Sequence, residues 1–354
     1  MQLGILGLPK AGKTALFNAL TASRKATGRF RASKTANVGI AVVEDRRLER
    51  LRDLYQPRRF VPAQVRFVDV PGIDRGRGET LDLAELRMMD GLVHVVRAFE
   101  DPELLHPSGG VDPRRDIAAI DLELILADYE VVERRLERLV QARKRGLTDL
   151  EKRERALLSD RVLPALEAET SLRRLELDTE EEKRLRGYGL LSLKPMLVVL
   201  NVDEDLAAVP AAIGGIEAPP GTRILAVSAC LEEEISRLDA ADQGDFLAEA
   251  GLDQPSAIRV VRAGYELLGL ISFFTVGDDE VRAWTIRRGS TALKAAGTVH
   301  SDIERGFIRA EVTEWHELVD AGSLAACRER ATLRLEGKGY RVRDGEVVHF
   351  RFNV

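Results

Sequence analysis

One stretch near the N-terminus constrains the fold more than any other: Gly7-Leu8-Pro9-Lys10-Ala11-Gly12-Lys13-Thr14 has the spacing of a phosphate-binding loop. Its glycines let the backbone approach a phosphate closely enough for inward-pointing N–H groups to bind the oxygens. Lys13 would place an ammonium between the outer phosphates, and Thr14 would offer its hydroxyl to Mg²⁺. An apolar strand over residues 3–6 and a helix from residue 15 flank the loop, as this motif requires. The predicted phosphate-contacting residues are Gly7, Leu8, Pro9, Lys10, Ala11, Gly12, Lys13, Thr14 and Ala15.

Length and composition limit the remaining possibilities. With 354 residues the chain is long enough for two or three domains. Its net charge of -5 excludes a globally basic nucleic-acid-binding protein, so any such contact must be local. Cys230 and Cys327 are the only cysteines, too few for a disulfide framework or a zinc site. Neither a signal segment nor a long apolar run occurs, so we expect a cytoplasmic protein with no membrane partner.

A second motif follows the strand predicted over residues 65–70. Asp69-Val70-Pro71-Gly72 lies roughly fifty residues after the phosphate loop, where this element is a strong indicator of the same site. Asp69 would hold Mg²⁺ through water, and the N–H of Gly72 would reach the terminal phosphate. Between the two motifs, residues 23–34 carry five basic side chains without a regular period. This segment is either a solvated connection or a switch that folds over the nucleotide.

The nearly continuous apolar run over residues 91–99 predicts a strand buried on both faces. We expect His94, inside this strand, to be a core residue whose hydrogen bonds are satisfied. Residues 112–190 then carry apolar side chains at three- and four-residue steps among 17 basic and 19 acidic ones. This pattern predicts a salt-bridged helical hairpin, either purely solvated or partner-binding.

Strand character returns over residues 195–200, which end at Asn201, and over residues 223–227, which end at Ser228. Strands alternating with helices, with polar groups at their carboxyl ends, indicate a doubly wound, mostly parallel α/β sheet. From Phe273 onward the period is two, with turns that contain glycine, as in a small mixed sheet with 13 basic and 13 acidic residues. The predicted domains are a nucleotide-binding domain (1–111 and 191–272), a helical insertion (112–190) and a C-terminal domain (273–354).

Taken in order, these motifs resemble those of GTPase-class P-loop proteins and, more closely, of the YchF family of Obg-related, translation-associated NTPases. Residues 91–100, 259–265, 281–286, 300–310 and 350–354 carry the more specific part of the resemblance, which covers essentially the whole chain. It implies a nucleotide domain interrupted by a helical hairpin, followed by a ubiquitin-like (β-grasp) TGS domain. It also implies hydrolysis of ATP in preference to GTP and association with ribosomes or RNA. We expect a monomer.

The base-recognition element departs from the pattern that selects guanine. Guanine specificity in this class comes from an N-K-x-D element, whose Asp accepts two hydrogen bonds from the base. Here Val202 stands in place of the Lys and Glu204, one methylene longer, in place of the Asp. A displaced carboxylate should remove about 1 to 3 kcal/mol of discrimination, so ATP becomes plausible while GTP stays open. The predicted base-binding residues are Asn201, Val202, Glu204, Ser228, Ala229 and Cys230.

Three further departures concern catalysis. The family usually has an Asn, linked to a bound potassium ion, where this chain has Lys10, so we hypothesise that the Lys10 ammonium replaces the potassium; alternatively it points to solvent. The switch residue that reaches Mg²⁺ aligns with Ser33, with Thr35 nearby, which adds Ser33 to Thr14 and Asp69 as predicted metal ligands. Ile73 stands where Ras-type proteins have a water-orienting Gln.

No side-chain general base is evident, so we expect slow hydrolysis driven by charge neutralisation from Lys13, Mg²⁺ and Lys10. The alternative is a nucleotide-sensing protein that no longer hydrolyses. A small-metabolite kinase is disfavoured, because such an enzyme would not need the base-reading motifs.

Overall fold

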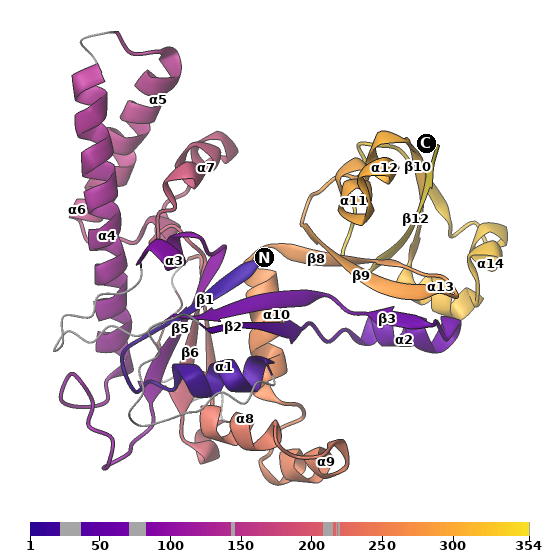
Figure 1. Cartoon of the computed structure of the whole chain (residues 1–354), viewed down its shortest axis with the longest axis horizontal. Helices are drawn as coiled ribbons and strands as arrows, with labels where there is room; N and C mark the ends of the chain where they lie inside the picture. The colour runs from indigo at the N-terminus through magenta and orange to yellow at the C-terminus, as the bar shows by residue number, and fades with distance from the viewer. Residues whose placement is uncertain are drawn as a thin grey trace. The chain divides into compact units, whose positions relative to one another are not determined.

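The computed structural model describes residues 1–21, 37–70, 83–142, 146–207, 215–216, 218 and 220–353. The chain divides into two compact units, Met1–Ile40 with Arg66–Val260 and Ala41–Val65 with Val261–Val354. Figure 1 shows the elements of each unit. Residues 41–65 are thus grouped with the C-terminal sheet, while the three-part domain division made from the sequence stays a prediction. Among the described residues, no helix combines the length and apolar character needed to span a membrane.

The first unit is built on a sheet with the strand order β2-β4-β1-β5-β6-β7. These strands are β1 (Gln2–Leu6), β2 (Asn37–Val42), β4 (Gln64–Asp69), β5 (Gly91–Ala98), β6 (Met196–Val202) and β7 (Thr222–Val227). β1 pairs in parallel with β4 and β5, and β5–β6 and β6–β7 are also parallel. The carboxyl ends of these five strands therefore lie at one edge of the sheet.

Burial explains why these segments form the centre of the sheet. β6 is buried along its whole length and β5 along all but its last residue, as expected for strands covered on both faces. Leu92 and Val198 belong to a core that also contains Ile120 and Leu124 of helix α4. The helices of this unit outside the helical region are α1 (Lys13–Thr21), α3 (Leu83–Arg87), α8 (Ala229–Ile235), α9 (Ala240–Glu249) and the start of α10 (Ser256–Leu267).

The stretch predicted as a helical hairpin is helical in the structure. It contains α4 (Pro113–Ala142), α5 (Asp149–Leu157), a π-helical turn η2 (Leu158–Val162), α6 (Leu163–Glu167) and α7 (Thr179–Leu185). It has a hydrophobic core of its own, in which Val132 and Leu139 of α4 pack with Leu157 and Leu166. Ion pairs connect its helices, among them Arg135 with Glu154 at 2.8 Å. The partner-binding role considered for this stretch stays a prediction.

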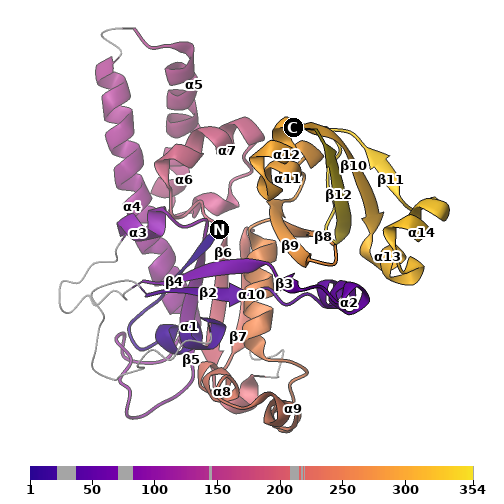
Figure 2. The ribbon, with the colours of Figure 1, turned by 45° about the vertical axis from the view of Figure 1, so that its right-hand side comes forward.

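The second unit contains a mixed sheet with the order β11-β10-β12-β8-β9-β3. Its strands are β3 (Arg59–Val61), β8 (Leu270–Thr275), β9 (Glu280–Arg287), β10 (Phe307–Glu314), β11 (Arg334–Glu336) and β12 (Glu346–Phe352). Its helices, beside the end of α10, are α2 (Arg46–Tyr55), α11 (Ala292–Val299), α12 (Ser301–Arg305), α13 (Trp315–Ala321) and α14 (Leu324–Glu329). Figure 2 shows α11 and α12 against the sheet, where Ala292 and Ala296 pack with Phe273 and Phe350.

No pattern in the sequence indicates that β3 joins this sheet. β3 pairs in parallel with β9, and the backbone N–H groups of Arg58 and Arg59 donate to the carbonyls of Asp278 and Asp279, each at 3.0 Å. A three-residue strand has too little periodicity to be recognised, and its partner is more than two hundred positions away in the chain. Long-range pairing of this kind is visible only in three dimensions.

Candidate nucleotide-binding site

Four of these five parallel strands carry the predicted site residues at their carboxyl ends. The phosphate loop follows β1, Asp69 ends β4, Asn201 lies near the end of β6, and Ser228 follows β7. In doubly wound sheets this edge is where ligands bind. The structure thus brings to one rim four motifs that lie far apart in the sequence.

Two glycines shape the phosphate loop. Gly7 has φ 150°, and a Cβ added to it would lie 2.2 Å from the carbonyl oxygen of Val95. Gly12 has φ 95°, and its Cβ would lie 2.2 Å from Nδ2 of Asn201. Neither position has room for a side chain, so the requirement for glycine here comes from protein contacts as well as from the expected approach of a phosphate.

Lys13 is the buried cation of the loop. Its Nζ donates to the carbonyl oxygens of Gly7 at 3.0 Å and Leu8 at 2.9 Å. Burial lowers the pKa of Lys13 from 10.5 to about 8, against the opposing attraction of the Asp69 carboxylate. A phosphate oxygen would compete with the two carbonyls for this ammonium. The position of Lys13 therefore fits the phosphate-binding role predicted for it.

Thr14 and Asp69 come together as predicted. The Thr14 hydroxyl donates to Oδ2 of Asp69 at 3.1 Å, and Nδ2 of Asn37 lies 3.4 Å from the same oxygen. Hydroxyl and carboxylate oxygens are the ligands that Mg²⁺ prefers, so this pair fits that ion. The other predicted residues of this region, Ser33 and Gly72, lie outside the described residues, as do Thr35 and Ile73.

Asn201 connects two loops of the rim. Its Nδ2 donates to the Ala11 carbonyl at 3.0 Å, and its Oδ1 accepts from the Ala229 N–H at 2.9 Å. The side chain is buried, and it ties the phosphate loop to the segment after β7. From the sequence, Asn201 was expected to recognise a base, and this internal role was missed because it depends on a contact with residue 11.

The other base-binding candidates fall into two groups. Val202 is buried in the hydrophobic core, so the structure does not bring its side chain to the rim. Ser228 caps helix α8 by accepting from the Leu231 N–H at 3.4 Å. Glu204 and Cys230, by contrast, are both exposed and lie side by side. Partial removal of water around the Cys230 thiol raises its pKa, and its hydrogen bond to Glu204 and the negative charge of that carboxylate raise it further.

Lys10 occupies an unusual backbone position. It has φ 64°, a left-handed conformation that Gly or Asn adopts more readily than Lys. Its side chain is exposed and forms no hydrogen bond or ion pair with any residue that the structure describes. A free ammonium therefore stands on the phosphate loop, which agrees with both alternatives considered for it.

His94 is a core residue, as predicted, but its hydrogen bonds are not satisfied. It is 1% exposed, and neither ring nitrogen has a hydrogen-bond partner in the part of the chain that the structure describes. Burial lowers the pKa of His94 to about 3, and the positive charges of Arg173 and Lys13 lower it as well. The ring is therefore neutral, and the expectation of a satisfied histidine was wrong.

Arg97 lies at the same edge of the sheet as the site residues but was not predicted from the sequence. It is buried near the end of β5, and its guanidinium donates to the carbonyls of Phe99 at 3.1 Å, Asp101 at 3.3 Å and Leu104 at 2.6 Å. It thereby fixes the loop that follows β5 at the same rim. An Arg in an otherwise apolar strand was the available signal.

Two family models match this chain. One, described as a 50S ribosome-binding GTPase, matches residues 2–130. The other, for the C-terminal domain of YchF-type GTPases and described as a protein of unknown function, matches residues 270–353. Together they span the phosphate loop and the C-terminal sheet.

Curated relatives match over the full length. The ribosome-binding ATPase YchF of Bacillus subtilis is 42% identical over 366 aligned residues, covering 100% of both chains. The protein of the same name from Haemophilus influenzae is 41% identical, covering 100% of this chain and 99% of its own. The solved structure of the Schizosaccharomyces pombe YchF GTPase is 29% identical, with a TM-score of 0.84, and the match covers 99% of this chain and 97% of that one. These similarities confirm the predicted fold class, a P-loop α/β domain with a helical insertion and a C-terminal β-grasp domain.

Proposed function

Because this chain belongs to the YchF family, we propose that it binds ATP in preference to GTP, hydrolyses it slowly with Mg²⁺, and uses its nucleotide state as a switch on the ribosome. The main support is the meeting of Lys13, the Thr14–Asp69 pair and the Asn201 tie at one edge of the sheet. Two relatives are named ribosome-binding ATPases, which supports both the nucleotide and the partner. We place this activity in the cytoplasm and in a monomer.

The residues of the rim have separate roles in this proposal. Thr14 and Asp69 would hold Mg²⁺, with Ser33 as a third ligand by resemblance, and the bound ion would neutralise charge on the phosphates. Lys13 would leave the carbonyls of Gly7 and Leu8 for phosphate oxygens. Since the phosphates are negative, they would raise the pKa of Lys13 again and keep it charged. The N–H of Gly72 would contact the terminal phosphate.

Lys10 would supply a fixed positive charge where relatives use potassium. Its free ammonium supports this role, and the left-handed backbone explains why an Asn, which adopts this conformation more readily than Lys, can stand at the same position. We expect hydrolysis to be unchanged when potassium is exchanged for sodium, and Lys10→Asn to become potassium-stimulated. Clear potassium stimulation of the unmodified protein would contradict this role for Lys10.

Glu204 would weaken guanine recognition. It is exposed beside Cys230, which belongs to the neighbouring segment predicted to bind the base. Titration with non-hydrolysable ATP and GTP analogues should show tighter binding of ATP. Glu204→Asp should reduce the difference between the affinities for the ATP and GTP analogues. Val202 should not be changed to Lys, because the ammonium would then lie in the hydrophobic core. If Glu204→Asp leaves the ratio unchanged, this account of base choice is wrong.

Phosphate release tests the proposal as a whole. The full chain should release phosphate from ATP slowly, faster with ribosomes present, and Lys13→Ala should reduce both rates to background. ATP binding without any release above the Lys13→Ala background, alone or with ribosomes, would instead identify a nucleotide-sensing protein.

A further inference from the structure

Helix α8 carries a glutamate that is almost completely buried. Glu232 lies in the first turn of this helix, two residues after the predicted base-binding residue Cys230, and is 2% exposed. Its Oε1 accepts the backbone N–H of Ser256 at 2.6 Å, and its Oε2 accepts that of Ala257 at 3.0 Å. Burial of a carboxylate costs free energy unless its oxygens are hydrogen-bonded. The two bonds therefore explain why Glu232 can lie in the interior.

The two N–H groups belong to the first turn of helix α10. The first N–H groups of a helix have no partner within the helix, and the positive end of the helix dipole lies beside them. Helix α5 obtains its cap from Thr148, the residue directly before it. Helix α10 is preceded by Pro255, whose side chain has no acceptor, and it is capped by Glu232 instead. The cap of α10 is therefore also a link between two helices.

The charge of Glu232 suits this link. Burial raises the pKa of Glu232, while the N–H groups of Ala257 and Ser256 oppose that shift because they stabilise the carboxylate. The positive charge of Arg259, three residues further along α10, acts in the same direction as the N–H groups. Hydrogen bonds to an ionised carboxylate are shorter and stronger than those between neutral groups. The link is therefore strongest when Glu232 is ionised.

The beginning of α8 is tied to the phosphate loop. The Ala229 N–H donates to Oδ1 of Asn201 at 2.9 Å, and Nδ2 of Asn201 donates to the Ala11 carbonyl at 3.0 Å. Helix α8 is thus fixed by Asn201 at its first residue and by Glu232 three residues later. Cys230 lies between these two ties, so both of them determine its position.

We propose that Glu232 is a positioning residue of the nucleotide-binding site, which holds residues 228–230 in place for the base by fixing α8 to the first turn of α10. The inference rests on the proposed function and deepens it, since Glu232 would act without contacting the nucleotide. Helix α10 continues from the first compact unit into the second after Val260, so the base-binding segment is linked to a helix that belongs to both units. Because linkage is reciprocal, a bound nucleotide should in turn stabilise the first turn of α10.

Three variants of the full chain separate positioning from a purely structural cap of α10. Glu232→Ala removes both the cap and the link to α8. Glu232→Ala combined with Pro255→Ser restores a cap, because Ser directly before the first helical residue accepts from N–H groups of the first turn, but it does not restore the link. Glu249→Ala, at an exposed glutamate of α9, is the control for the loss of one negative charge.

Titration with non-hydrolysable ATP and GTP analogues and thermal unfolding are measured for each protein. Glu232→Ala should have a lower melting temperature and should bind the ATP analogue roughly threefold to tenfold more weakly. The double variant should regain most of the melting temperature but not the affinity. In steady-state hydrolysis the KM for ATP should rise by the same factor while kcat stays unchanged, because the base lies away from the reacting phosphate. The control should behave like the unmodified chain.

Hydrogen exchange tests the link without destabilising the fold. The ATP analogue should slow exchange of the Ser256 and Ala257 N–H groups in the unmodified chain, and it should do so much less in the double variant. The inference is overturned if Glu232→Ala keeps its affinity, if the double variant regains affinity together with melting temperature, or if the analogue leaves exchange at these two groups unchanged.

The same titrations distinguish this inference from the proposed function. If the unmodified chain binds neither analogue, the proposed function fails and the inference fails with it. If the unmodified chain binds ATP and Glu232→Ala binds it equally well, only the positioning role of Glu232 is lost.

Discussion

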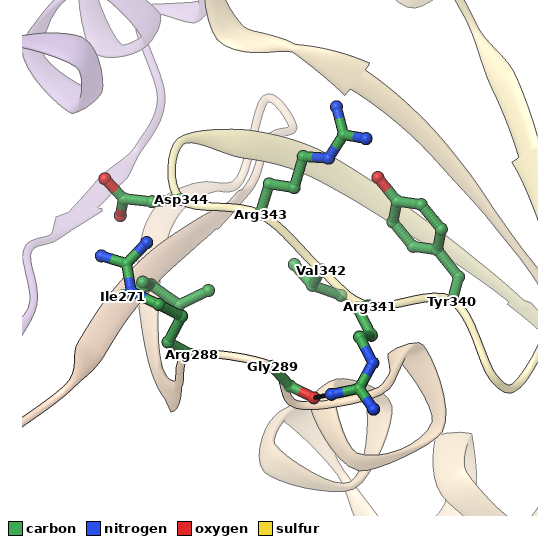
Figure 3. Close-up of a pocket in the computed structure, with 8 residues that line it drawn as sticks. All are labelled: Ile271, Arg288, Gly289, Tyr340, Arg341, Val342, Arg343 and Asp344. Carbon is green, nitrogen blue, oxygen red and sulfur yellow. Dashed lines mark hydrogen bonds between the residues drawn. The ribbon is translucent and has the colours of Figure 1, made fainter.

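The cations of the phosphate loop and those around a hollow in the C-terminal sheet are held in opposite ways. Lys13 is buried, bound by two carbonyls of its own loop, and has its pKa lowered to about 8. The hollow, of about 580 Å³, is surrounded by Arg288, Arg341 and Arg343 (Figure 3), and we call it the arginine hollow. Its arginines are exposed, and Arg288 and Arg343 form no side-chain hydrogen bond or ion pair with any described residue. Arginine stays charged at all accessible pH values, whereas the charge of Lys13 depends on what surrounds it. The positive charge of the phosphate loop therefore depends on what surrounds Lys13, whereas the positive charge of the arginines is permanent.

Lys13→Ala should have the largest effect and should separate the two sites. Without the ammonium, ATP affinity should fall roughly 100-fold, since a buried charged donor to the phosphates is lost. Arg343→Ala, which removes one charge of the arginine hollow, should leave ATP affinity unchanged. Titration of ATP against each protein checks this, with Lys152→Ala, an exposed lysine on α5, as the control. A similar loss of ATP affinity in Arg343→Ala would show that the two sites are not independent.

Substitutions at the two sites should also differ in their effect on the free energy of unfolding. Asn201→Ala removes two buried hydrogen bonds and leaves the Ala11 carbonyl and the Ala229 N–H unpaired, so the free energy of unfolding should fall by about 2 kcal/mol. Arg343→Ala removes no side-chain hydrogen bond or ion pair and should change it by less than about 0.5 kcal/mol. Urea unfolding measures both. Asn201→Asp keeps the acceptor for Ala229 but places a buried carboxylate oxygen against the Ala11 carbonyl, so it should destabilise at least as much as Asn201→Ala. Equal values for Asn201→Ala and Arg343→Ala would contradict the tie.

How much of this could be predicted from the sequence depends on the distance between partners. The phosphate loop, its flanking strand and helix, and the end of β4 at Asp69 are local patterns, because each depends on residues within one or two turns of chain. The link between Asn201 and Ala11 depends on residues 190 positions apart. The arginine hollow joins Arg288 to Arg341 through a fold that no local period reveals, and the balanced charge count of the domain concealed it.

The affinity for ATP should depend on pH, whereas the charge of the arginine hollow should not. Lys13 of the free protein loses its proton at about 8, below its usual 10.5, whereas phosphates favour the protonated form. ATP affinity should thus be flat below that pH and fall by up to about tenfold per unit above it. The arginines of the hollow stay charged over the same range. Calorimetry of ATP binding in two buffers of different ionisation enthalpy should detect proton uptake near pH 8; its absence would show that Lys13 is already neutral or stays charged.

Substitution of His94 should have the smallest effect. The ring of His94 is buried and has no hydrogen-bond partner among the described residues. Its pKa is about 3 in the folded state against 6.5 ordinarily, so the unfolded chain takes up a proton that the folded chain refuses between these values. Stability from this residue is therefore complete above about pH 6.5 and is lost as the pH falls towards 3, by up to about 1.4 kcal/mol per pH unit.

His94→Leu should remove this contribution to the pH dependence of the free energy of unfolding. It should also raise stability at neutral pH, because a leucine leaves no unpaired nitrogen in the core. Urea unfolding of the two proteins at several pH values measures the difference, and the variant His349→Leu, at an exposed histidine, is the control for the substitution itself. Equal slopes for the unmodified protein and His94→Leu would mean that the buried ring accepts a proton after all. In that case a positive charge would lie beside Lys13, and the conditional charge of the phosphate loop would depend on the histidine as well.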